Sequence, residues 1–221
     1  MRRLPYVAVT LLVAASILAI ATTAAFAILG EETTETSEGA PLQKDTWTLE
    51  APSAFEGSVV STEQEIEFAP TSKKLEDYHR MLKGVKCKNP LLGTATGESL
   101  GDAAGIVLQL GELHWVDANL ALILWNPVHL ECLYSSGTVL LIVSGANLGK
   151  VSPTNSKTKR FSLELKGSKG KQTNVTEYEN NSGEKVIPKL EASSSLGSEG
   201  AASENDSSDI SLETERETEL T

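Results

Sequence analysis

The chain has 221 residues, 22% of them charged, a formal net charge of -11 at pH 7 and two cysteines. This length accommodates about one domain besides terminal segments, which excludes large multidomain architectures. Two cysteines far apart in the sequence do not form a zinc or redox motif, and the chain holds no Gly-rich phosphate loop or Rossmann fingerprint.

Residues 1–27 have the three-part layout of a secretory signal peptide. A basic start at residues 1–3 is followed by an apolar run at 7–20, and Ala25-Phe26-Ala27 fits the small-x-small rule of signal peptidase. The sequence therefore predicts an exported protein, secreted or at the cell surface, whose mature chain begins after Ala27.

The alternative is a leader that stays attached. Apolar character extends over residues 7–29, about long enough to span a bilayer as a single-pass anchor. The residues that follow include Glu31 and Glu32, and the Lys/Arg cluster of a stop-transfer flank is missing. These features favour cleavage, and a membrane-tethered surface protein, touching the membrane only through its leader, is the competing interpretation.

The negative charge is concentrated at the two ends of the chain. Residues 28–53 carry six acidic side chains against one lysine, and residues 191–221 carry nine against one arginine, whereas residues 54–190 are balanced. This pattern predicts a disordered acidic linker at 28–53, a β-rich globular domain at 54–190 and an acidic low-complexity tail at 191–221. Period-two alternation leaves open an edge strand near 210–217.

Short strands are predicted through the middle of the chain. Residues 60–68 alternate with a period of two, which is typical of a strand with one solvent-facing side. Further strand-like runs, separated by turn signals, are Gly105–Leu110, Leu113–Asp117, Leu120–Trp125, Val128–Leu133, Thr138–Ser144, Phe161–Lys166 and Val186–Leu190. This pattern predicts an all-β fold, a small antiparallel sandwich or barrel-like domain with disordered acidic flanks.

Two segments leave alternatives open. Residues 73–83 fit a helix with Leu75, Tyr78 and Leu82 on one stripe, and they also fit a strand and turn. Residues 120–133 are apolar on both faces. They predict a central hairpin that is either covered on both sides or keeps one side for a partner.

Cys87 and Cys132 are predicted to form a disulfide. Exported proteins mature in an oxidising environment, where an even pair of cysteines is bridged by default. The alternative is two buried free thiols.

Residues 97–101 spell G-x-S-x-G, the nucleophile-elbow pattern of α/β-hydrolases, with Ser99 in the place of the nucleophile. That chemistry needs a strand before the serine and a helix after it, but residues 93–96 and 102–105 are poor formers of either. Asp117 and His129 follow the serine in the order that a triad requires. A Gly/Ser-rich loop is the favoured interpretation, and a small secreted serine hydrolase is the alternative.

A basic stretch is the other charge feature. Residues 150–171 hold seven Lys or Arg against Glu164 alone. The simplest interpretation is a solvated face, and the sharper hypothesis is contact with an anionic polymer through Lys157, Lys159 and Arg160, or pairing with the acidic tails. Nucleic acid is disfavoured because the stretch lacks interleaved aromatics and the protein is exported.

Several segments between Cys87 and Leu190 form a recognisable pattern. They are Thr94–Gly97, Gly105–Leu108, Glu112–Val116, Val128–Cys132, Asn155–Lys159, Lys169–Gln172 and Glu177–Asn180. In this pattern, over about half its length, the chain resembles a group of secreted bacterial proteins that occur as multiple paralogues in soil actinobacteria. The group has no assigned activity, so the resemblance implies an exported bacterial protein with a structural role for Cys132 and nothing about its chemistry.

Together these features predict a secreted or cell-surface, non-enzymatic module that binds an unknown ligand or serves a structural role. The expected partner classes are a cell-wall polyanion or another surface protein. No cofactor is predicted, and no metal site is predicted because His79, His114 and His129 share no ligand spacing.

Overall fold

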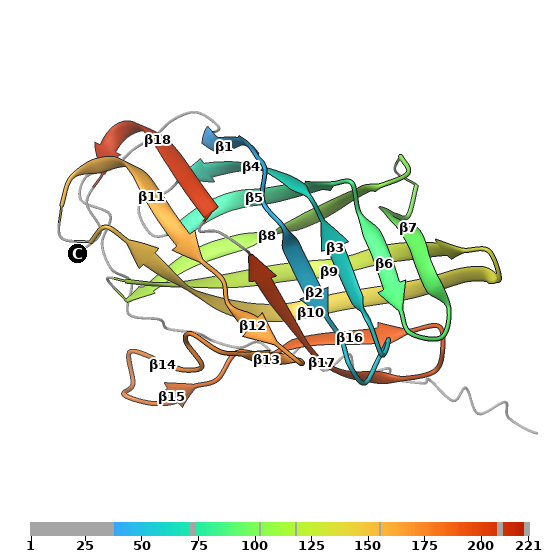
Figure 1. Cartoon of the computed structure of the whole chain (residues 1–221). Helices are drawn as coiled ribbons and strands as arrows, with labels where there is room; N and C mark the ends of the chain where they lie inside the picture. The colour runs from blue at the N-terminus through green and yellow to red at the C-terminus, as the bar shows by residue number, and fades with distance from the viewer. Residues whose placement is uncertain are drawn as a thin grey trace, which may run out of the picture.

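The computed structural model describes residues 38–70, 74–101, 103–117, 119–154, 156–206 and 210–218. Every regular element in these ranges is a β-strand, and every strand pairing is antiparallel (Figure 1). The strands are β1 (Glu38–Gln43), β2 (Trp47–Glu50), β3 (Ser58–Ser61), β4 (Glu63–Pro70), β5 (Lys74–Lys83), β6 (Lys86–Asn89), β7 (Gly93–Ser99), β8 (Ile106–Asp117), β9 (Leu120–Tyr134), β10 (Gly137–Ser152), β11 (Thr158–Glu164), β12 (Gly167–Ser168), β13 (Lys171–Gln172), β14 (Tyr178–Glu179), β15 (Lys185–Val186), β16 (Leu190–Ser194), β17 (Glu199–Asp206) and β18 (Ile210–Thr218). The predicted all-β class is confirmed.

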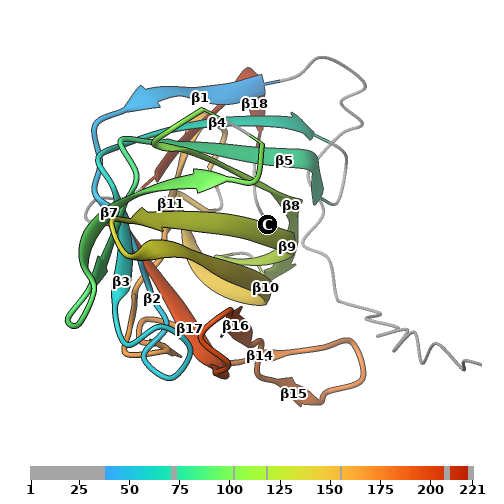
Figure 2. The ribbon, with the colours of Figure 1, turned by 90° about the vertical axis from the view of Figure 1, so that its right-hand side faces the viewer.

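Eight of these strands close into a barrel, so of the two predicted architectures, sandwich and barrel, the structure has the barrel. Their order around the wall is β9-β7-β6-β3-β2-β17-β16-β10, and the pairing of β10 with β9 completes the ring (Figure 2). Alternate side chains of each strand point inward, so Trp47 and Leu49 of β2 and Leu141 and Val143 of β10 are buried in one core. A ring of eight strands leaves an interior that side chains can fill.

The hairpin of β9 and β10 is longer than the barrel and changes partners along its length. The first part of β9, up to Trp125, pairs with β8, and the part from Leu130 pairs with β7. Pro127 lies at the change, where a residue without an N–H cannot donate to either ladder. Likewise β10 pairs first with β16 and then with β11. Beyond the barrel, β8, β5, β4 and β1 continue from β9, and β11 and β18 continue from β10, until β1 and β18 lie side by side.

The domain is larger than the predicted 54–190. Residues 47–50 of the predicted linker form β2, and β16 and β17 extend into the predicted tail, so the barrel wall uses strands from both flanks. The prediction of a disordered linker up to residue 53 and a separate tail from 191 is therefore wrong for these strands. The edge strand considered near 210–217 corresponds to β18, which pairs with β11. Residues 74–83 form strand β5, not a helix.

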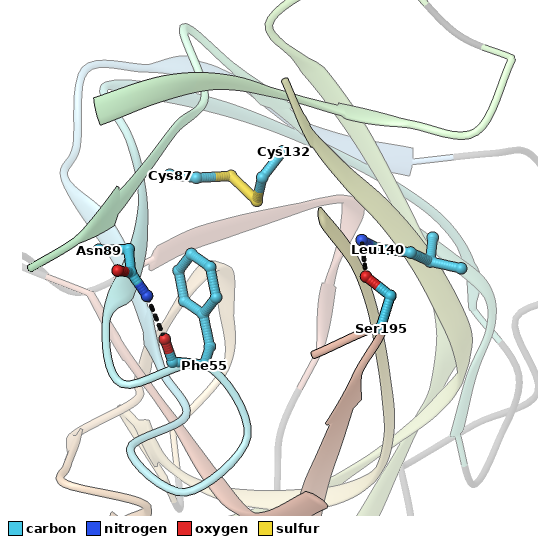
Figure 3. Close-up of a disulfide and its surroundings, with 6 residues drawn as sticks. All are labelled: Phe55, Cys87, Asn89, Cys132, Leu140 and Ser195. Atoms are coloured by element: carbon cyan, nitrogen blue, oxygen red, sulfur yellow. Dashed lines mark hydrogen bonds between the residues drawn. A yellow bond between two sulfur atoms is a disulfide. The ribbon is translucent and has the colours of Figure 1, made fainter. Parts of the chain in front are cut away.

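The disulfide joins Cys87 of β6 to Cys132 of β9, with 5.8 Å between their Cα atoms (Figure 3). In the sheet, β7 lies between these two strands, so the bridge crosses the inner side of β7. Both sulfurs are buried, and the ring of Phe55 points into the same space. The predicted pairing of the two cysteines is confirmed.

Gly97 is the residue of β7 beneath this bridge. A Cβ at this position would lie 2.8 Å from Val85 Cγ1 and 3.1 Å from Cys87 Sγ, closer than normal contacts. The disulfide that passes over position 97 explains why this residue is glycine. The first glycine of the G-x-S-x-G pattern therefore has a packing reason that involves no catalysis.

Replacing Gly97 with valine is expected to lower the free energy of unfolding by about 1–3 kcal/mol, because the new side chain has no room between Val85 and the bridge. Urea titration of the oxidised protein measures this loss. Thr96→Val on the same strand, where the side chain is exposed, is the matched control. Equal stability of the two variants would contradict the packing role of Gly97.

A second, smaller hydrophobic cluster covers the outer apolar face of β9. Ile123 and Trp125 face the main core, whereas Leu122 on the opposite face packs with Val116, Leu148 and Tyr178. This cluster lies under residues 173–189, a segment carrying β14 and β15 that we call the arm; it projects beside the barrel in both views. The outer face of β9 is thus covered by the chain itself over this part.

Candidate functional site

The barrel wall has a gap between β10 and β17. β16 begins at Leu190, opposite Gly145 of β10 and Ala202 of β17, and β11 joins β10 only from Lys150. The N–H of Ala146 still donates to the carbonyl oxygen of Lys189 at 2.8 Å, but among the described strands none pairs with residues 147–149 of β10 on this side. A side chain supplies part of the missing ladder, since Gln172 Nε2 donates a hydrogen bond of 2.5 Å to the carbonyl oxygen of Leu148.

The short hairpin of β12 and β13 lies against β17 beside this gap. The N–H of Gly170 donates to Ser203 Oγ at 3.0 Å. A Cβ at Gly167 would lie 2.6 Å from the carbonyl oxygen of Glu204, so the hairpin approaches β17 closely only because this residue is glycine. The β12–β13 hairpin therefore takes the place of a strand on this side of β17.

A groove with a volume of about 390 Å³ runs along the gap between the barrel and the arm. Val175 and Ile187 of the arm give it an apolar side, and Ile187 is 61% exposed, whereas Leu148 of β10 lies at the groove but is buried. Two lysines, Lys171 and Lys189, and one acid, Glu191, are also among the residues that line the groove. This combination of apolar walls and a few charged groups is typical of a site for a small molecule.

Asn147 connects the groove to the interior of the protein. Its side chain is buried, it lines the groove, and its Nδ2 donates to Glu204 Oε2 at 2.7 Å. The other oxygen, Glu204 Oε1, accepts from Gln109 Nε2 at 2.7 Å. The carboxylate of Glu204 is thus held by β10 on one side and β8 on the other.

Glu204 belongs to a buried polar cluster. Its members are at most 4% exposed and come from strands far apart in the sequence; they are Asp45, Gln64, Arg80, Gln109, Asn147, Glu204 and Asp206. Gln64 Nε2 donates to both Asp206 Oδ1, at 3.0 Å, and Asp45 Oδ2, at 2.8 Å. The polar cluster therefore ties β17 and the segment before β2 to β4.

Arg80 is the only basic member of the polar cluster. Its Nη1 lies 3.7 Å from Glu204 Oε2 and its Nη2 lies 3.8 Å from Asp206 Oδ2, distances of ion pairs rather than of direct hydrogen bonds. The guanidinium carbon is 5.3 Å from the centre of the Trp125 ring, which adds a cation–π contact. Arg80 thus places one positive charge between two acids of β17.

Burial and these charges shift the pKa values of the polar cluster. Burial raises the pKa of the Asp206 carboxyl to about 7; Arg80 opposes the rise, and Glu204 and Asp45 add to it. Burial alone would lower the pKa of Arg80, but the attraction of Asp206, Tyr78 and Glu204 outweighs it, so this pKa is raised. Burial also raises the pKa of the Tyr78 hydroxyl. Arg80 therefore stays charged, while Asp206 titrates near neutrality.

Ser99 lies at the end of strand β7, and its Oγ accepts a hydrogen bond of 2.9 Å from the N–H of Leu108. It lines a shallow surface pocket together with His129. In the sheet, Ser99 is paired with Leu130, whose side chain is buried, whereas the neighbouring His129 is exposed and points to the other face. Every regular element described around Ser99 is a strand. The strand-to-helix turn of a nucleophile elbow is therefore not formed there.

The three basic residues singled out in the sequence lie on and before β11. Lys157, Lys159 and Arg160 are all exposed. Arg160 forms an ion pair with Glu213 of β18, so the basic stretch and the acidic C-terminal region are neighbours in the fold. Contact with an anionic polymer through these residues stays a prediction.

Within the described ranges, no group of three or more His, Cys, Asp or Glu side chains is arranged to hold a metal ion. No helix long and apolar enough to cross a membrane occurs in the same ranges. The predicted leader at 1–27 and the alternative anchor at 7–29 lie outside the described residues.

The described residues form an antiparallel β-barrel with a groove that opens beside it. Comparisons of the chain with protein-family models, with curated proteins and with solved structures found no match.

The groove and the polar cluster were both missed by sequence reasoning. Glu204 and Asp206 sit in a segment whose composition predicts a solvated tail, and Asp45 sits in the predicted linker. One signal was present, since Gln64 shares a predicted strand face with Ile66, and both are buried. The gap in the wall depends on where β16 begins relative to β10 and β17, and periodicity within one strand does not contain that information.

Proposed function

We propose that the protein is an exported, non-enzymatic binding module whose ligand site is the groove. The supporting observation is a groove of about 390 Å³ with exposed Ile187 on one side and Lys171 and Lys189 at its rim. Pockets of this size bind small molecules, and an apolar surface left open to solvent is a recurrent mark of a binding surface. The buried disulfide is compatible with an extracellular location.

The ligand class follows from the lining. Val175 and Ile187 suit an apolar body, and the two lysines outnumber Glu191, so they suit an anionic group. The proposed ligand is a small amphipathic anion. A β-barrel scaffold with such a groove at its side fits a receptor or carrier for such molecules.

The dye 8-anilinonaphthalene-1-sulfonate, which combines an aromatic body with a sulfonate, is a suitable probe. It should bind saturably with a rise in fluorescence, and Ile187→Ser should weaken this binding about fivefold or more, because roughly 1 kcal/mol of apolar contact is lost. Leu196→Ser, at a side chain that is 54% exposed outside the groove, is the matched control and should leave the affinity unchanged.

The charged part of the site has its own control. Lys171→Gln should also weaken the probe, whereas Lys86→Gln, at an exposed lysine of β6, should have no effect. Failure of the wild-type protein to bind the dye saturably, or equal binding by the Ile187 and Leu196 variants, would overturn the groove as the ligand site.

A further inference from the structure

The charges of the polar cluster do not balance. Glu204 and Asp206 of β17 are two carboxyl groups that face Arg80, which is the only cation among the buried members. Lys166, which is half-buried between β11 and β12, donates from Nζ to the backbone oxygen of Asp206 at 2.7 Å. Ionising both carboxyls of β17 would leave excess negative charge in the interior, where it is poorly solvated.

Hydrogen-bond donors are also distributed unequally among these carboxyls. Glu204 accepts one hydrogen bond on each oxygen, from Asn147 and Gln109. Asp206 accepts on Oδ1 from Gln64, which it shares with Asp45, and its Oδ2 is buried without a hydrogen-bond partner among the described residues. A carboxylate needs more donors than a carboxylic acid does, so Asp206 is the member that is least supported as an anion.

We propose that the polar cluster is a proton-operated latch, in which a proton held by Asp206 keeps β17 and the segment before β2 fastened to β4 and β5. Loss of this proton leaves a buried anion beside Glu204 and Asp45 that Arg80 and Lys166 do not fully compensate. β17 then loosens from the strands on the opposite side of the interior. Tyr78 and Trp125, which flank Arg80, are neutral and offer no further positive charge.

The raised pKa of the Asp206 carboxyl supports this latch and sets its pH window. The folded protein holds the proton up to about pH 7, whereas an unfolded chain releases it near pH 4. The stabilisation that this proton provides is fully present below about pH 4. It decreases as the pH rises from about 4 to about 7, and above that it is lost and changes no further. Opening of β17 should therefore increase by up to about tenfold per pH unit within this window.

The latch goes beyond the proposed ligand site but touches it. β17 supplies Ala201 and Ala202 to the lining of the groove, and Glu204 holds Asn147 at its floor. Loosening of β17 at higher pH would therefore also alter the groove. The latch itself needs no ligand and is tested without one.

Hydrogen–deuterium exchange of the full chain between pH 5 and 8.5, corrected for the intrinsic pH dependence of exchange, measures the opening. The amides of β17 in the wild-type protein should lose protection as the pH rises towards 7. Asp206→Asn keeps an oxygen that accepts from Gln64 but cannot ionise, so its β17 should exchange independently of pH. Glu199→Gln, at an exposed acid of the same strand, should behave like the wild type.

A flat profile in the wild type, or the same slope in the Asp206→Asn variant, would overturn the latch. If that variant does not fold, the infrared spectrum of the wild type decides the question. At pH 6, exposed carboxyls are ionised, so a carbonyl band of a protonated carboxyl that disappears by pH 8.5 supports the latch. Absence of this band at pH 6 contradicts it.

Discussion

Replacing Cys87 and Cys132 together with alanine is expected to lower the free energy of unfolding by about 4 kcal/mol. The two residues are 45 positions apart, and opening a loop of this length releases a large conformational entropy in the unfolded chain. The bridge also crosses the inner side of β7, where both sulfurs are buried, so its loss removes packing above Gly97. Denaturant titration of the oxidised wild type and the double variant measures the difference.

Reduction of the wild-type protein provides an independent comparison, because the chain has two cysteines and hence one bridge to break. The reduced wild type and the double alanine variant should unfold at similar denaturant concentrations, both well below the oxidised protein. A double variant within about 1 kcal/mol of the oxidised wild type would show that the bridge contributes little.

The second large effect is expected at Arg80. Arg80→Met at pH 7.5 should lower the free energy of unfolding by about 3–5 kcal/mol, because it leaves Glu204 and Asp206 buried without their cation. Methionine fills a similar elongated space next to Trp125 but carries no charge. Urea unfolding followed by tryptophan fluorescence measures this loss.

The pH dependence separates lost charge from lost packing in this variant. At pH 5 the carboxyl of Asp206, whose pKa is raised to about 7, is protonated, so the destabilisation by Arg80→Met should be clearly smaller than at pH 7.5. Lys86→Met, at an exposed lysine of β6, should change stability by less than about 0.5 kcal/mol at either pH. A loss at Arg80 that is the same at both pH values would mean that the charge is unimportant.

Much of the barrel could be predicted because its strands follow a period of two. Residues of β8, β9 and β10 alternate between buried and less buried positions along most of their length, and Gly137 lies in the predicted turn between β9 and β10. The disulfide followed from the predicted export and the even cysteine count. Strand order and closure could not be predicted, because they depend on pairings between segments more than a hundred residues apart, such as β2 with β17.

In residues 73–83 the spacing of the apolar side chains fits both a helix and a strand, so spacing alone could not distinguish them. Tyr78 and Leu82 are four residues apart, a distance that places side chains on one face of a helix and equally on one face of a strand. Arg80, between them, is buried on the same face, which is the period of a strand. Charged side chains are normally exposed, and the acidic partners of Arg80 on β17 are far away in the sequence.

The acidic C-terminal region was predicted to be a tail because its buried acids, like Arg80, have partners that are far away in the sequence. Ala202, Glu204 and Asp206 alternate as a strand does, but small and acidic residues are normally typical of a solvated tail. The buried acids are accommodated because Arg80, Gln64, Gln109 and Asn147 surround them. Composition records the type of each residue and not the groups that meet it in the fold.

Because β16 and β17 are strands of the closed barrel, residues 190–206 are an integral part of the domain and not a separable tail. A fragment ending at residue 190, where the composition changes, would leave β2 and β10 as open edges and strip Arg80 of both its counter-ions. Any shortened form intended for expression has to keep β2 at one end and β17 at the other.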